Sequence, residues 1–208
     1  MPLISTGAGG GSDFEPVPAG THMARCVSVV DFGFQETQHG PKPKVYLGFE
    51  IAGVRVEWEK DGKRHEGPAL IGSTYNNSIH PKSVLGQHLV NWRGREFTDA
   101  ERDGFDLFTI VGVPCMISVT HNVKAGKTYA NVSGIMGAPP GVKVPKAEGD
   151  LLRYSASAPE TLGDFDKLPA WMQKKCNASA PAPSAAPPQV PPPGHSPGPD
   201  DFDDDIPF

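Results

Sequence analysis

The sequence predicts a mainly β fold, and three observations carry this prediction. Between about Thr21 and Gly137, short runs rich in Val, Ile and aromatic residues alternate with Gly, Pro and Asn, as in small antiparallel β units. Residues 44–51 alternate strictly between apolar and other residues, which is typical of a strand with one buried face. One helical pattern interrupts the runs after the third expected strand.

The first three expected strands form the N-terminal half of this unit. They cover residues 24–34, 44–51 continued by 54–58, and 69–75. Asp61-Gly62 lies between the second and third strands and is typical of a tight hairpin turn. This hairpin therefore has a basic tip, which consists of Lys60, Lys63 and Arg64.

A helix and two further strands complete the unit. Apolar residues recur at helical spacing from Val84 to Trp92, and Pro81 suits the first turn of this helix. Thr98 to Glu101 has the pattern of a capping box, which predicts a second short turn. The last two strands flank a turn that contains Gly126, and they cover residues 113–122 and 127–135.

The resulting order is β-β-β-α-β-β. It is the order of an OB-fold, a five-stranded, partly open barrel that binds oligonucleotides on one face. Unrelated small barrels can share this order, so the strand pattern leaves both interpretations open.

Five segments are expected along the chain. Residues 1–20 contain a GAGGGS run and several prolines and are expected to form a flexible arm before the OB domain at 21–150. Residues 151–177 are expected to form a short helical extension with Phe165, Leu168, Trp171 and Met172 on one side. The composition of 178–199 predicts a disordered Pro-rich linker, and 200–208 forms an acidic tip.

The net charge of -5 is concentrated at the C-terminal end of the chain. Five of the 24 acidic residues lie within 200–208, and the remaining 19 balance the 19 Lys and Arg residues. A neutral body can carry a local basic groove, so the acidic average does not exclude a nucleic-acid partner.

The composition favours a cytoplasmic protein that is not an enzyme. The sequence has no secretory signal pattern and no run of membrane-spanning length, and Cys26 and Cys115 lie in apolar runs where buried thiols are expected. Neither HExxH, a zinc-site spacing nor a Walker A sequence is present. We therefore expect no metal and no cofactor.

The tip, DDFDDDIPF, combines carboxylates with apolar anchors. Acidic residues give fast, salt-sensitive encounter with a basic surface, and buried aromatic anchors slow dissociation. Most charge runs only solubilise a protein, but a solubilising tail has no need of a terminal Ile-Pro-Phe. The residues expected to dock a partner are Asp203, Asp204, Asp205, Ile206, Pro207 and Phe208.

The tip resembles the C-terminal end of bacterial single-stranded-DNA-binding proteins. That resemblance implies recruitment of replication and repair enzymes of a bacterial host. The stretches GKTYANV at 126–132 and FDKLPAW at 165–171 resemble bacteriophage-encoded single-stranded-DNA-binding proteins. This second resemblance implies an OB-fold and a preference for single strands, and a homo-oligomer remains possible.

Sequence-tolerant binding of single strands requires aromatic platforms for bases and cations for phosphates. Tyr46 and Tyr129 are expected opposite the apolar faces of their strands, although surface packing is an equal alternative for each ring. Phe49 and Trp58 follow the apolar set and are expected in the core. The residues predicted to bind nucleic acid are Tyr46, Arg55, Lys63, Arg64, Tyr75, Asn77, Lys124, Lys127 and Tyr129.

Two other functions remain open at this stage. The chain could be an adaptor or inhibitor that binds no DNA and occupies the pockets that recognise such tips. Carboxylates such as Glu57, Glu59 and Asp61 suggest a two-metal nuclease, but on an alternating strand Glu57 and Glu59 form a solvated face.

Overall fold

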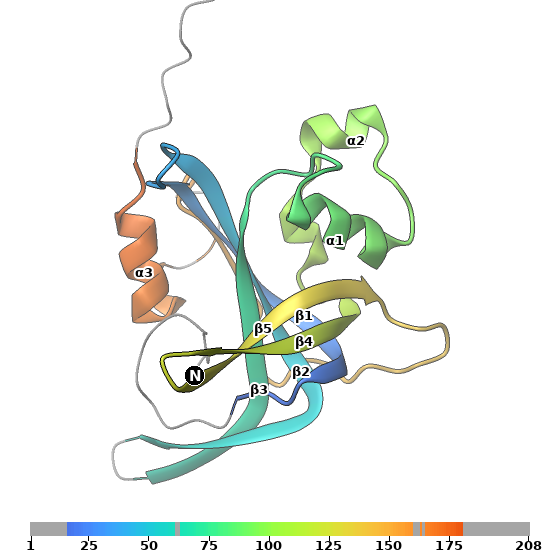
Figure 1. Cartoon of the computed structure of the whole chain (residues 1–208), viewed down its shortest axis with the longest axis vertical. Helices are drawn as coiled ribbons and strands as arrows, with labels where there is room; N and C mark the ends of the chain where they lie inside the picture. The colour runs from blue at the N-terminus through green and yellow to red at the C-terminus, as the bar shows by residue number, and fades with distance from the viewer. Residues whose placement is uncertain (1–15, 61–62, 160–162, 164, 181–208) are drawn as a thin grey trace, which may run out of the picture.

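The computed structural model describes residues 16–60, 63–159, 163 and 165–180 (Figure 1). Most of the predicted N-terminal arm, the Asp61-Gly62 turn, most of the linker and the whole tip lie outside the described residues. The strands are β1 (Gly20–Gln35), β2 (Lys42–Lys60), β3 (Lys63–Asn76), β4 (Pro114–Lys124), β5 (Lys127–Gly137) and β6 (Leu152–Ser155). The helices are α1 (Val84–Arg93), α2 (Asp99–Gly104) and α3 (Ala170–Asn177), with short 3₁₀ helices η1 (Leu107–Ile110) and η2 (Phe165–Lys167).

The strands form one open, barrel-like sheet in the order β3-β2-β1-β4-β5. All neighbours on this path are antiparallel, and β1 is long enough to pair with both β2 and β4. β3 and β5 approach each other across the opening, which brings the two ends of the sheet together. This arrangement confirms the predicted mainly β class and is consistent with an OB-fold.

The interior of the barrel follows from the alternation in the sequence. Val45, Leu47, Phe49 and Ile51 point into one apolar cluster, and each is at most 1% exposed. The cluster also contains Cys26 and Cys115, so the prediction of buried thiols is confirmed.

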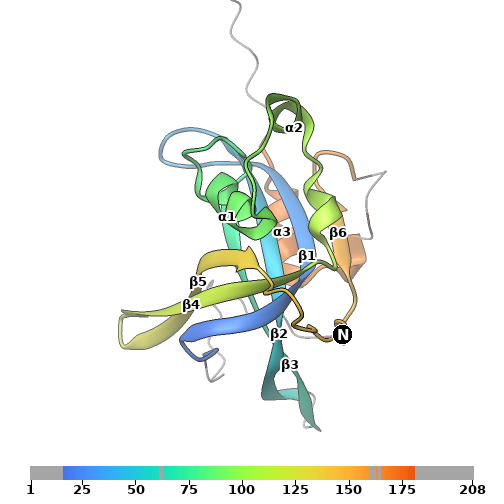
Figure 2. The same ribbon diagram turned by 90° about the vertical axis from the view of Figure 1, so that its right-hand side faces the viewer.

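Two hairpins extend beyond the barrel in different directions (Figures 1 and 2). The β2–β3 hairpin begins after a bulge between Glu50 and Arg55, where Gly53 has a φ of 75° that glycine adopts without strain. The β4–β5 hairpin turns at Ala125 and Gly126, both with positive φ, as the sequence predicts for the glycine.

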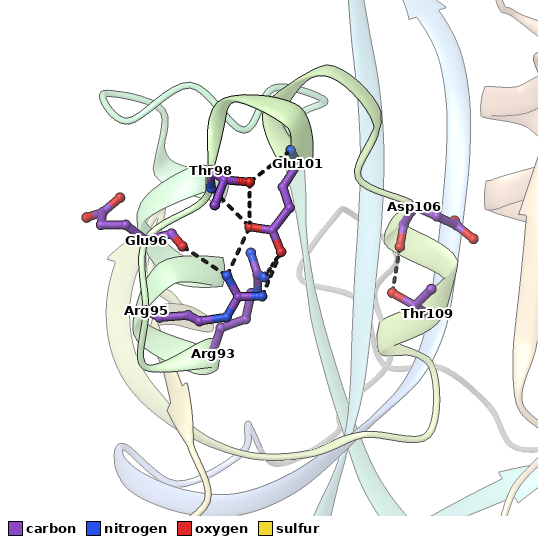
Figure 3. A network of polar contacts seen from close by, with 7 residues as sticks. All are labelled: Arg93, Arg95, Glu96, Thr98, Glu101, Asp106 and Thr109. Carbon is purple, nitrogen blue, oxygen red and sulfur yellow. Dashed lines mark hydrogen bonds and ion pairs between the residues drawn. The ribbon is translucent and has the colours of Figure 1, made fainter.

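The helices between β3 and β4 close one end of the barrel. Helix α1 begins at Val84, so Pro81 precedes its first turn instead of lying in it as predicted. Ser83 caps α1 by accepting a hydrogen bond from the Gly86 backbone N–H. The predicted capping box is confirmed, because Thr98 and Glu101 exchange hydrogen bonds at the start of α2. Glu101 also pairs with Arg93 at 2.5 Å and Arg95 at 2.6 Å (Figure 3), and these hydrogen bonds hold its pKa well below the usual 4.5.

An outer layer formed by residues 144–159 and 165–180 covers β1 and β2. Arg25 and Glu50, which are cross-strand partners, hold the loop at 144–149 through its backbone. Arg25 donates to the carbonyls of Val144 at 2.8 Å and Pro145 at 2.9 Å, and Glu50 accepts from the Glu148 and Gly149 N–H groups. Strand β6 then pairs with β1 in parallel, a strand that the sequence analysis did not predict.

Helix α3 completes the outer layer with a second apolar cluster. Leu168, Met172 and Cys176 pack against Val30, Phe32 and Tyr46 from the strands, and Tyr154 of β6 joins them. The apolar side predicted for residues 165–172 therefore packs on the barrel. Met172 is fully buried, whereas Lys174 of the same helix is exposed.

Met172→Ala is expected to lower the free energy of unfolding by about 2 to 5 kcal/mol, because it removes a buried side chain and leaves a cavity. Lys174→Ala is the matched control on the exposed side of α3, and its effect is expected to stay within about 0.5 kcal/mol. Urea unfolding followed by circular dichroism measures both. Equal stability of the two variants would show that α3 is not part of the folded unit.

Candidate nucleic-acid interface

The outer layer removes Tyr46 from the candidate interface. Tyr46 is 2% exposed, and its ring lies edge-on to Trp171 of α3, with 5.4 Å between the ring centroids. Burial raises the pKa of its hydroxyl far above the usual value, and the hydroxyl has no hydrogen-bond partner among the described residues. The prediction that this ring faces solvent is wrong, because α3 packs on the face opposite the barrel interior.

Tyr75 is also buried, but on the inner side of the sheet. Its side chain is 6% exposed, belongs to the barrel cluster, and contacts His88 of α1 through its hydroxyl at 3.2 Å from Nδ1. Burial raises the pKa of Tyr75 to about 12 and lowers the pKa of His88. The prediction that Tyr75 offers a stacking surface is therefore also wrong, since its ring ties the third strand to the helix.

The two predicted arginines of the β2–β3 hairpin already have acidic partners. Arg55 pairs with Glu66 at 2.5 Å and with Glu148 of the outer layer at 2.9 Å. Arg64 lies 3.6 Å from Glu57. These pairs are exposed and individually weak, so they do not prevent phosphate contacts, but they offset the local positive charge.

Three predicted residues come together on the β4–β5 hairpin. Lys124 and Lys127 are cross-strand partners at its end, and Tyr129 lies two residues from Lys127 on the same face. Ala130 packs toward the core, so the Tyr129 ring lies on the opposite side of β5, as the sequence predicts. Neither lysine forms an ion pair with any described residue.

Asn77 lies apart from both hairpins, at the end of β3. Its backbone N–H donates to the Pro43 carbonyl at 2.8 Å. Asn77 also lines a cavity of about 430 Å³ beside α2, together with His80, Arg102 and Phe105. The structure thus distributes the nine predicted residues over two hairpins, the core, the α3 contact and this cavity.

Sequence reasoning missed Trp58, the aromatic residue best placed on the β2–β3 hairpin. Trp58 alternates with Val54 and Val56 and was therefore expected in the core, but it lies beyond the barrel and is only half-buried. Its ring is nearly parallel to that of its cross-strand partner His65, with 5.8 Å between centroids and 15° between planes. The turn that the sequence predicts at Asp61-Gly62 places the end of the hairpin well past Trp58 and the barrel strands, and this signal could have revealed the exposure of Trp58.

Comparisons with protein families and with curated proteins identify no relative of this chain, because no family model matches it and a search of curated proteins finds no match. Within the described residues, no helix is long and apolar enough to cross a membrane. The docking residues predicted in the tip, from Asp203 to Phe208, lie outside the described residues.

Two conservative variants test the placement of the tyrosines. Tyr46→Phe removes a hydroxyl without a partner, so the free energy of unfolding is expected to stay equal or to rise by about 1 kcal/mol. Tyr75→Phe removes the hydrogen bond to His88 and is expected to cost about 0.5 to 1.5 kcal/mol. Urea unfolding of both variants measures the contrast, and a larger loss for Tyr46→Phe would contradict the described burial.

Proposed function

We propose that the chain binds single-stranded DNA with little base preference and protects it during replication, recombination or repair. The observation that carries the proposal is a barrel with OB-type strand order from which two hairpins extend, each with an aromatic residue near its end. Lys63 on one hairpin and Lys124 and Lys127 on the other form no ion pair with the described residues. Nucleobases of any sequence offer a stacking surface, and every phosphate offers a charge. Such hairpins suit a flexible strand better than a small, enclosed ligand.

The tip sequence supports the second half of the proposed function. DDFDDDIPF resembles the end of bacterial single-stranded-DNA-binding proteins, and the barrel sequence resembles bacteriophage-encoded proteins of this type. We therefore propose that the chain acts in a bacterial cytoplasm, as a phage-encoded protein, and recruits host replication and repair enzymes through Asp203 to Phe208.

Binding to fluorescent oligo-dT is expected to weaken steeply as salt rises, because each neutralised phosphate releases a counterion. Duplex DNA of the same length is expected to bind more weakly, since its bases are already stacked. Fluorescence anisotropy at several salt concentrations measures both. Absence of binding at low salt would favour an adaptor that only occupies tip-binding pockets, and degradation of the oligonucleotide with magnesium would favour a nuclease.

Deletion of residues 200–208 is expected to abolish recruitment of tip-binding enzymes and to leave strand binding intact or stronger. Five tethered aspartates compete with phosphates for cations, so the gain should be largest at low salt.

Phe208→Ala separates the two roles of the tip, because it removes the apolar anchor and keeps every Asp. Docking should fail while competition with DNA persists. Anisotropy with a labelled helicase or nuclease that recognises bacterial tips measures docking. Full docking by Phe208→Ala would show that the tail acts through charge alone.

A further inference from the structure

The central part of β2 is closed to a nucleic acid on both sides. Residues 45–51 are all buried, with the barrel interior on one side and the outer layer on the other. In an OB-fold, the outer face of the second and third strands is where oligonucleotides bind. Here α3 and the loop at 144–149 occupy the β2 half of that face, so a strand that binds this protein needs a surface other than the central part of β2.

The β2–β3 hairpin offers such a surface on the side that continues the barrel interior. Val54 and Val56 pack against the barrel cluster, and Trp58 follows them on the same side. Gly67 of β3 lies against the indole of Trp58. A Cβ at this position would be only 3.0 Å from the ring, so the close approach requires glycine. Trp58 of β2 thus lies against β3, close to Gly67 and nearly parallel to the ring of His65.

Alternation separates the charges of this hairpin between its two sides. Glu57 and Glu66 are cross-strand partners on the side away from Trp58, where they meet Arg64 and Arg55. Lys63 lies two residues from His65 and therefore on the Trp58 side. It is exposed and forms no ion pair with the described residues.

We infer that Trp58, His65 and Lys63 form the base-stacking site for single-stranded DNA. This inference rests on the proposed function and assigns its site to the hairpin rather than to the outer face of the barrel. A base stacks on the exposed part of the Trp58–His65 platform, and the next phosphate pairs with Lys63. On the other side of the hairpin, Glu57 and Glu66 pair with Arg64 and Arg55 and offset their positive charge, so Lys63 is the better placed cation for a phosphate.

The alternative is that the Trp58–His65 pair only stabilises the hairpin, as cross-strand aromatic pairs do. The experiment must therefore separate binding from folding. Trp58→Ala is expected to weaken binding of oligo-dT about 10- to 100-fold, as expected for a lost base stack. Trp58→Phe keeps a ring and is expected to bind within about 5-fold of the wild-type chain.

Tryptophan fluorescence provides the readout that a purely structural role would not change. Oligo-dT is expected to quench the emission of the wild-type chain and of Trp171→Phe, but not that of Trp58→Phe. Lys63→Ala and Arg64→Ala form a second matched pair, adjacent in sequence and on opposite sides of the hairpin. Lys63→Ala is expected to reduce the slope of log binding constant against log salt concentration by about 1, which corresponds to one phosphate contact. Arg64→Ala is expected to change this slope less.

The outcomes distinguish failure of the site from failure of the function. If the wild-type chain binds no oligonucleotide, the proposed function is wrong. If the wild-type chain binds and Trp58→Ala binds equally well, the assigned site is wrong. If Trp58→Ala does not fold, quenching decides: undiminished quenching in Trp58→Phe, or its loss in Trp171→Phe, would place the strand elsewhere, against α3 in the second case.

Discussion

Burial of β2 on both faces is the constraint on which the arrangement of this protein depends. A strand in a small barrel usually keeps one face in solvent, but here Arg25 and Glu50 bind the backbone of the loop at 144–149, and α3 continues the cover over Tyr46. Both Arg25 and Glu50 use charged groups to satisfy main-chain hydrogen bonds, which are among the stronger ones in proteins. The outer layer is thus held on the sheet by specific polar and apolar contacts and belongs to the folded unit.

The same constraint determines what remains accessible. With the β2 surface covered, the two hairpins are prominent exposed parts of the sheet, because there the strands continue past the core and their inward side chains are no longer covered. Trp58 illustrates the result, because its position in the alternation is that of a core residue while its surroundings are those of a surface residue. An aromatic side chain that is fixed by its own strands yet reaches solvent is a suitable platform for a base.

Local patterns predicted much of the fold. These predictions depend on residues close together in sequence. They are the order of the elements along the chain as far as β5, the helix at α1, the capping box of Thr98 and Glu101, and the β4–β5 turn. The candidate site was predicted less well, because its residues depend on contacts between distant segments. Arg55 meets Glu148 across 93 residues, and Trp171 covers Tyr46 from the far end of the described chain. The amphipathic pattern of α3 was visible, but no local signal showed which face it would cover.

Photo-crosslinking of a bromodeoxyuridine-substituted oligonucleotide, followed by peptide mapping, tests the central claim most directly. It requires no substitution, so the outer layer and the hairpins remain as they are in the native chain. The account predicts adducts on the β2–β3 hairpin, at Trp58 or His65. Adducts on Tyr46 would contradict it, because they would require α3 to leave the barrel, and adducts on Trp171 would contradict it by placing the strand against α3.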